Sequence, residues 1–183
     1  MIYLKHIWTV LKHKWYVGKE LMRYGLVWRA LTHDLSKLFP PEIKGYSYWF
    51  YHKYGKDFKN TIRGEPTGEK STPWHKRLWD RAWKHHQEHN KHHWQYWIIT
   101  KEEADKQLSW FHRVLYVVID NNKIYEMPKK YVIEMVCDWI GAGIAYNGKR
   151  DILEWYDKNK DNMTLHPKTR GLVESLIEKE SVR

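Results

Sequence analysis

The stretch His33-Asp34-Leu35-Ser36-Lys37 is the most informative part of this sequence, because it combines two potential metal ligands with a lysine. Adjacent His and Asp side chains can both ligate one divalent cation, because neighbouring side chains of a helix or helix end diverge by about 100° and can still reach a shared point. Lys37 lies roughly one helical turn beyond Asp34, where its ammonium can meet an anion held by that cation. The stretch therefore predicts a metal site with an anion contact, and other helices must supply the remaining ligands.

Hydrophobic periodicity predicts a chain that is mostly all-α. Residues 2–24 have an inward face at three- and four-residue steps that includes His6, His13 and Leu21, while Lys12 and Lys19 mark an opposite, wet face. Further helices are predicted at about 28–38, 46–54, 74–92, 128–146 and 151–159 and from 167 onward, and the one at 28–38 is expected to carry the His-Asp pair. A β-branched and aromatic pattern around an Asp-Asn-Asn turn predicts a small β-hairpin near 115–126.

The composition indicates one folded, basic domain over residues 1–183, with a mobile loop at about 55–73 where Gly, Pro and charges gather. The formal net charge of +10 favours anionic partners. The single cysteine, Cys137, excludes an intramolecular disulfide and a multi-thiolate zinc site. No run approaches the roughly 20 apolar residues of a membrane span, and the N-terminus lacks a secretory segment. We therefore expect a cytoplasmic protein without membrane contact.

Two positions far from the motif can complete the metal site. His13 lies on the inward face of the first helix, where a histidine is often simply a core residue, and His6 on the same face competes for the role. Asp138 shares a helical face with Glu134 in an apolar, small-residue setting. A carboxylate there is costly to bury unless it is paired or coordinated. Pairing with a buried arginine or tryptophan N–H is the simpler alternative for Asp138.

A histidine-rich run can supply further ligands: His85-His86-Gln87-Glu88-His89-Asn90-Lys91-His92-His93. If one helix continues through this run, at most half of its histidines can face one site. His86 together with His92 or His93 is then the candidate ligand set. Asn90 is a candidate polar partner that fixes an imidazole.

In chain order the candidates are His13, His33-Asp34, His86, His92 or His93, and Asp138. This order resembles the two-metal form of the HD-domain phosphohydrolase superfamily. The motif 33–37 is similar to the His-Asp-x-x-Lys core of HD-type phosphodiesterases, with Lys37 at the phosphate-contacting place. The chain more closely resembles an uncharacterised bacterial and phage family, a domain of unknown function. The segments that carry this closer resemblance are 13–17, 33–37 with Glu42, 90–94, 134–143 and 165–170.

The superfamily resemblance implies an HD-like helical bundle and a metal-dependent phosphohydrolase of the nucleotidase or phosphodiesterase type. Imidazole and carboxylate ligands without thiolate suit Mn, Fe, Co, Ni or Zn, as one or two ions. Glu134 or Glu42 could accept a proton or orient another residue. The candidate catalytic residues are Asp34, Lys37 and Glu134, and the candidate substrate contacts are Lys37, Arg29, Asn90 and Arg170.

The expected partner is a phosphorylated small molecule, and the positive charge of the chain makes a nucleotide the leading candidate. If the second histidine group holds no ion, the site resembles the mononuclear deoxynucleotidases of the superfamily. A non-enzymatic protein that binds nucleotides or nucleic acid is one alternative. A di-iron oxygenase on the same scaffold is another.

Overall fold

The structure is a computed structural model that describes residues 2–40, 42–54, 73–99, 116–119 and 122–183. It is mostly α-helical, which confirms the predicted fold class. Among the described helices, none is both long and apolar enough to cross a membrane. The helical elements are α1 (Ile2–Arg23), α2 (Val27–Thr32), η1 (Leu35–Leu38), α3 (Glu42–Tyr54), α4 (Pro73–His89), η3 (Trp94–Trp97), α6 (Lys129–Ala142), η5 (Gly143–Asn147), α7 (Ile152–Asn159), η6 (Lys160–Asn162) and α8 (Pro167–Ser181).

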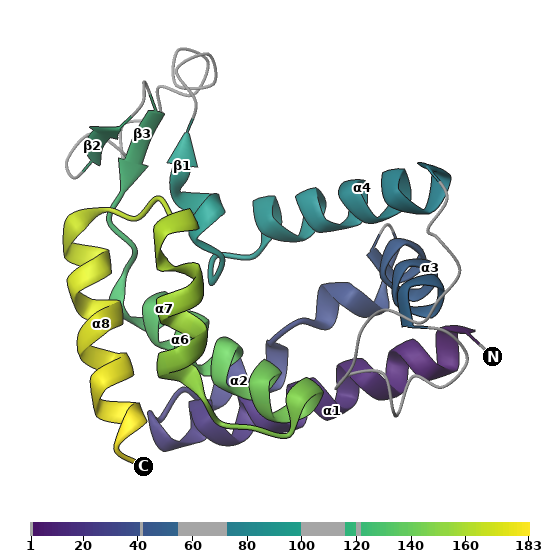
Figure 1. Ribbon diagram of the computed structural model, residues 1–183, viewed down its shortest axis with the longest axis horizontal. Coiled ribbons are helices and arrows are strands. Elements are labelled where there is room, and N and C mark those ends of the chain that lie inside the picture. Colours follow the sequence, from purple (N-terminus) through teal and green to yellow (C-terminus); the bar gives the residue numbers. More distant parts are fainter. Residues whose placement is uncertain (1, 41, 55–72, 100–115, 120–121) are drawn as a thin grey trace.

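A small antiparallel sheet lies at one end of the molecule (Figure 1). Its strands are β1 (Ile98–Ile99), β2 (Tyr116–Ile119) and β3 (Asn122–Tyr125), in the order β1-β3-β2. The pairing of β2 with β3 confirms the predicted hairpin, and the addition of β1 was not anticipated. The mobile loop predicted at about 55–73 falls, apart from its last residue, outside the described part of the chain.

Helix α6 is the centre of the hydrophobic core. Its sequence is apolar on nearly all sides, and residues 132–137 and 140–141 are buried. It packs against α1 on one side and α8 on the other (Figure 1). Gly141 makes the approach to α1 possible, because a Cβ built on it would lie 2.4 Å from Cγ2 and 2.8 Å from the backbone nitrogen of Val17. The position of α6 relative to α1 therefore depends on a glycine.

Helices α3 and α4 form a second packed pair that lies against α1. They approach closely at Gly45, where a Cβ would lie 2.4 Å from Cβ of Ala82. In Figure 1, α4 extends across the molecule from the neighbourhood of α3 toward the sheet. The C-terminal end of α4 is thereby held over the segment between α2 and α3.

We expect Gly141→Ala and Gly18→Ala to change stability in opposite directions. The new Cβ at position 141 meets the backbone of α1, which cannot rotate away, and overpacking of this kind costs about 1–3 kcal/mol. At position 18 the nearest atoms, both of Ala30, lie at an ordinary 3.8 Å, so the gain in helix propensity of about 0.5–1 kcal/mol remains. Urea denaturation measures both free energies of unfolding. Equal shifts in the two variants would contradict this packing.

Candidate metal centre

The His-Asp pair lies at a break in the chain and not inside a helix. The helix expected at 28–38 is wrong in this respect, because α2 ends at Thr32 and η1 begins at Leu35. Among the described residues, Asp34 is the one non-glycine residue with a positive φ, 55°. Aspartate tolerates this left-handed conformation better than most residues. The break turns His33 and Asp34 toward the same interior space.

Lys14 stabilises this break from the neighbouring helix. Its ammonium donates to the carbonyl oxygens of Ala30, Leu31 and His33 at 3.3, 2.5 and 3.0 Å. These are carbonyls that the end of a helix leaves without intrahelical partners. A cation also interacts favourably with the negative end of the helix dipole. Lys14 therefore ties α1 to the end of α2, one residue after His13.

Four side chains from three parts of the chain meet in cluster A. Their ligand-capable atoms all lie within 4.8 Å of one another. Nε2 of His13 lies 3.2 Å from Oδ2 of Asp34 and 2.9 Å from Oδ1 of Asp138. Nε2 of His33 lies 3.4 Å from the same Asp138 oxygen. His13, His33 and Asp34 are buried, and the Asp138 side chain is 13% exposed. Cluster A consists of His13, His33, Asp34 and Asp138.

Glu134 sets the orientation of His33. Its Oε1 accepts from Nδ1 of His33 at 3.2 Å, and its Oε2 accepts from the Arg29 guanidinium at 2.5 Å. When Nε2 of His33 gives up its proton, Nδ1 keeps its own proton toward Glu134 and the Nε2 lone pair faces cluster A, as in metal sites where a carboxylate holds an imidazole ligand. Both oxygens of Glu134 accept hydrogen bonds, as those of a positioning residue do, and Glu134 also forms a third group of potential ligands with His33 and His92.

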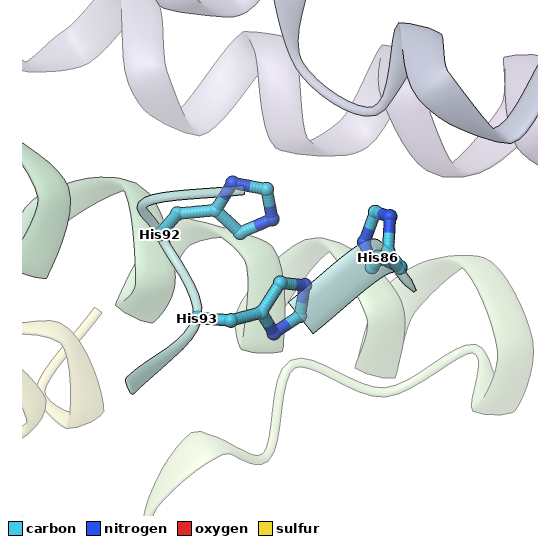
Figure 2. Close-up of side chains that lie close together, drawn as sticks. All are labelled: His86, His92 and His93. Carbon is cyan, nitrogen blue, oxygen red and sulfur yellow. The ribbon is translucent and has the colours of Figure 1, made fainter. Parts of the chain in front are cut away.

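Three imidazoles form cluster B, which consists of His86, His92 and His93 (Figure 2). Helix α4 ends at His89, and the turn that follows brings His92 and His93 back toward His86. The expectation of one continuous helix through the histidine-rich run is therefore wrong. All three rings converge, whereas a helix would have let His86 meet only one of the other two.

The Nε2 atoms of cluster B have the character of potential metal ligands. Each is buried, and within the described part of the chain none has a hydrogen-bond partner. Leaving a buried polar atom without a partner costs about 1–3 kcal/mol. Three such atoms in one place are therefore best explained by a ligand that binds all three. Neighbouring imidazole nitrogens are the donors that transition metals bind once their protons are displaced. The residues of cluster B thus fit a metal ion.

Glu42 orients His86 as Glu134 orients His33. The Glu42 side chain is fully buried, and its Oε2 accepts from Nδ1 of His86 at 2.8 Å. Its Oε1 accepts from Nδ1 of His85 at 2.8 Å, and Ser36 donates to Oε2 at 3.0 Å. Asn90 donates to the backbone oxygen of His86 at 2.8 Å and so holds the end of α4.

Asp34 lies between the two clusters and faces both. Its Oδ2 is directed to cluster A, and its Oδ1 lies 3.3 Å from Nε2 of His86 and 3.5 Å from Nε2 of His92. Oδ1 has no hydrogen-bond partner among the described residues. The Lys37 ammonium donates to Oδ2 at 2.5 Å. A carboxylate in this position can bridge two cations.

The charges of cluster A compensate one another. Burial alone would raise the pKa of Asp34, but the charges of His33 and Lys37 outweigh it and hold this pKa well below its usual value. Burial alone would lower the pKa of His33, but the carboxylates of Asp34 and Asp138 raise it to about 10. In cluster B, burial and the neighbouring imidazoles lower the pKa of His93 well below its usual value. His93 is thus neutral, the form in which an imidazole binds metal.

A cleft of about 320 Å³ opens onto the clusters. It reaches His33, Asp34 and His92, and its outer lining includes Arg29, Thr32, Asn90, Lys91 and Tyr131. The Arg29 guanidinium stacks 4.0 Å above the Tyr131 ring, which holds this cation at the mouth of the cleft. A larger cavity of about 490 Å³ lies beside Trp139 and Trp155 and includes no cluster residue.

Several candidates lie elsewhere or play other parts. Arg170 is not near the clusters, because its guanidinium is bound by the carbonyl oxygens of Lys160 and Met163. Nε2 of His6 lies 3.2 Å from the backbone oxygen of Lys37, so His13 and not His6 joins the clusters. Lys14 is not among the predicted site residues, although a lysine beside an inward-facing histidine can reach the end of a neighbouring helix.

Comparison with known proteins supplies the family. The model of a family of unknown function, DUF5662, matches residues 3–179. The chain belongs to this family. Searches of curated proteins and of solved structures each found no significant match. The resemblance to an uncharacterised family is thereby confirmed, and in this DUF5662 chain the link to HD-domain proteins stays a prediction.

We expect metal binding by the metal-free DUF5662 chain to release protons and to tighten as pH rises. His33 has a folded pKa of about 10 and must lose its proton to become a ligand. With one proton displaced, the apparent affinity rises about tenfold per pH unit between pH 6 and 9 and levels off above pH 10. Calorimetry in two buffers of different ionisation enthalpy measures the proton count. A pH-independent affinity over that range would contradict the arrangement of cluster A.

We expect Glu42→Gln to weaken metal binding about 10–100-fold, the usual cost of losing a carboxylate behind a histidine ligand. The amide can turn its NH₂ toward Nδ1 of His86 and thereby favour the wrong tautomer. Glu88→Gln on the exposed face of α4 is the matched control and should leave affinity unchanged. Competition against a fluorescent chelator measures both. An unchanged affinity in Glu42→Gln would show that Glu42 does not orient a ligand.

Proposed function

We propose that this protein is a metal-dependent phosphohydrolase that acts on a small phosphoester. The observation that carries the proposal is Asp34, a buried carboxylate with one oxygen toward each of two clusters of potential ligands. Such a bridging carboxylate suits a pair of ions, and pairs of ions about 3.5–4 Å apart are typical of enzymes that cleave phosphate esters. The similarity of the motif 33–37 to the HD-type core supports the same reaction class.

The donor atoms favour transition metals. Cluster A offers imidazole nitrogens and carboxylate oxygens, and cluster B offers imidazole nitrogens. These donors suit Mn²⁺, Fe²⁺, Co²⁺, Ni²⁺ or Zn²⁺. The thiol of Cys137 belongs to the hydrophobic core and to neither cluster. Ions bound here would polarise a phosphoryl oxygen and lower the pKa of water toward neutrality.

The chain's own cations would bind and orient the phosphate. Arg29 lines the cleft and keeps its guanidinium in place through Glu134 and the Tyr131 ring. The Lys37 ammonium donates a hydrogen bond to Asp34. From this position it can offset negative charge that develops on phosphoryl oxygens. Lys91 adds an exposed cation at the mouth. Glu134 and Glu42 hold histidines and would act as positioning residues.

The cleft limits the size of the substrate. Its volume of about 320 Å³ is at the lower end of the range of about 300–1,000 Å³ for small-molecule sites. A mononucleotide or a comparable phosphoester fits this scale. The cations Arg29 and Lys91 at the mouth of the cleft suit the phosphate of a nucleotide. A nucleotide is therefore the substrate class that we favour.

We expect the purified protein to carry about two transition-metal ions per chain and to release phosphate or a nucleotide from members of a phosphoester panel. Asp34→Asn should lose most of the metal and all measurable turnover, because one oxygen becomes an amide that cannot bridge. Asp80→Asn, at an exposed position of α4, is the matched control and should keep both. Elemental mass spectrometry and a phosphate assay measure the two properties.

Other outcomes would point to the alternatives. Full metal content in Asp34→Asn would exclude the bridging role. Iron-specific oxygen uptake without phosphate release would indicate an oxygenase. A metal-free protein that binds random DNA at low but not at physiological salt would indicate a binding protein that uses its basic surface.

A further inference from the structure

Helix α1 exposes an apolar stripe along its whole outer face. Trp8 and Trp15 are each 67% exposed, although tryptophan is among the largest apolar side chains. The stripe follows steps of three, four and seven residues, which place its members on one side of the helix. That side is opposite to the one that carries His13 and Val17 into the core. The stripe consists of Leu4, Trp8, Leu11, Trp15 and Met22.

Helix α2 extends this stripe sideways. It lies beside α1, where Gly18 is close to Ala30 and Lys14 caps its last turn. Trp28 is 75% exposed, and Val27 and Leu31 are exposed beside it. We call the combined surface the α1–α2 face, and it consists of Leu4, Trp8, Leu11, Trp15, Met22, Val27, Trp28 and Leu31.

The α1–α2 face is too large to be ordinary surface. With about 150–250 Å² for a whole aromatic side chain, its three tryptophans alone expose on the order of 300–500 Å². The largest apolar patch of a typical monomer covers about 300–600 Å² in total. Five further aliphatic side chains add to the tryptophans. A face of this size indicates a binding surface.

The charges beside this face decide which partner it fits. Lys12 and Lys19 are exposed on α1 along one flank of the stripe, and neither forms an ion pair among the described residues. The only acidic residue of α1, Glu20, is buried and paired with Arg23 and Arg150. Helix α2 contains no acidic residue. Two copies joined through this face would bring their lysines close together, which is unfavourable. An anionic surface would instead be attracted by these lysines.

We propose that the α1–α2 face docks on an anionic membrane surface. Tryptophan prefers the interface between headgroups and acyl chains, and lysine and arginine reach from there to anionic headgroups. A helix with Trp and Leu on one side and lysines beside them has the composition of surface-bound amphipathic helices. Each cation near an anionic bilayer raises the binding constant about tenfold or less. Stable binding therefore needs several cations together with several apolar side chains. The expectation of no membrane contact is replaced by this proposal.

The test is flotation of the full chain with vesicles. We expect binding to phosphatidylcholine vesicles that contain 30% phosphatidylglycerol, weak binding to phosphatidylcholine alone, and a loss of binding with added salt. Trp8→Ser combined with Trp15→Ser should weaken binding at least about tenfold for each tryptophan. Lys12→Glu combined with Lys19→Glu should weaken it at least about 30-fold. Leu153→Ser on α7 combined with Val118→Ser on β2 is the matched control, since both side chains are exposed outside this face.

Several results would overturn the proposal. One is the absence of binding to anionic vesicles, and another is equal binding by the tryptophan variant and the control. A third is a wild-type dimer in light scattering that becomes a monomer in the tryptophan variant while vesicle binding is absent, which would assign the face to a second copy. Circular dichroism shows that each variant is folded. The metal content of the tryptophan variant should equal that of the wild type, so this test stands apart from that of the phosphohydrolase.

Discussion

A carboxylate that is removed from water must be neutralised by its neighbours, and Asp34 imposes this requirement on the whole molecule. Its side chain is completely buried, at a cost that one partner could not offset. The compensating groups come from separate elements: His13 from α1, Lys37 from η1 and His86 from α4. The packing of α1 with α6 and with the α3–α4 pair thus serves to surround one charge with partners. A fold organised in this way is suited to hold cations at its centre.

In each cluster a buried glutamate orients one histidine by a hydrogen bond. Glu134 fixes His33 and Glu42 fixes His86, in each case through Nδ1, which leaves Nε2 directed inward. Glu134 lies one helical turn before Asp138, so α6 presents a positioning carboxylate and a potential ligand on one face. The two glutamates belong to different helices, so each cluster has a positioning carboxylate of its own. Glu134 also reaches cluster B, since its Oε1 lies 3.7 Å from Nδ1 of His92. Asp34 directs one oxygen to each cluster.

The sequence predicted the helices and most of the cluster residues, because burial and the helical period place His13 and Asp138 without knowledge of the tertiary structure. It failed where the chain leaves the helical period. The left-handed Asp34 depends on a cap from Lys14, and the reversal after His89 depends on contacts of Asn90. Both are tertiary effects that periodicity does not register. The outer face of α1 was predicted as wet from its lysines, whereas its tryptophans are exposed beside them.

Helix α2 connects the two proposed sites, since two of its six residues line the cleft and three belong to the α1–α2 face. Arg29 and Thr32 line the cleft, while Trp28 and Leu31 are part of the α1–α2 face. The hydroxyl of Thr32 also donates to the backbone oxygen of Trp28, so the two surfaces share one rigid turn. A protein docked through this face would therefore place the mouth of its cleft within about one helical turn of the lipid headgroups. Such a geometry favours phosphoesters that are concentrated at a membrane surface over those that diffuse freely.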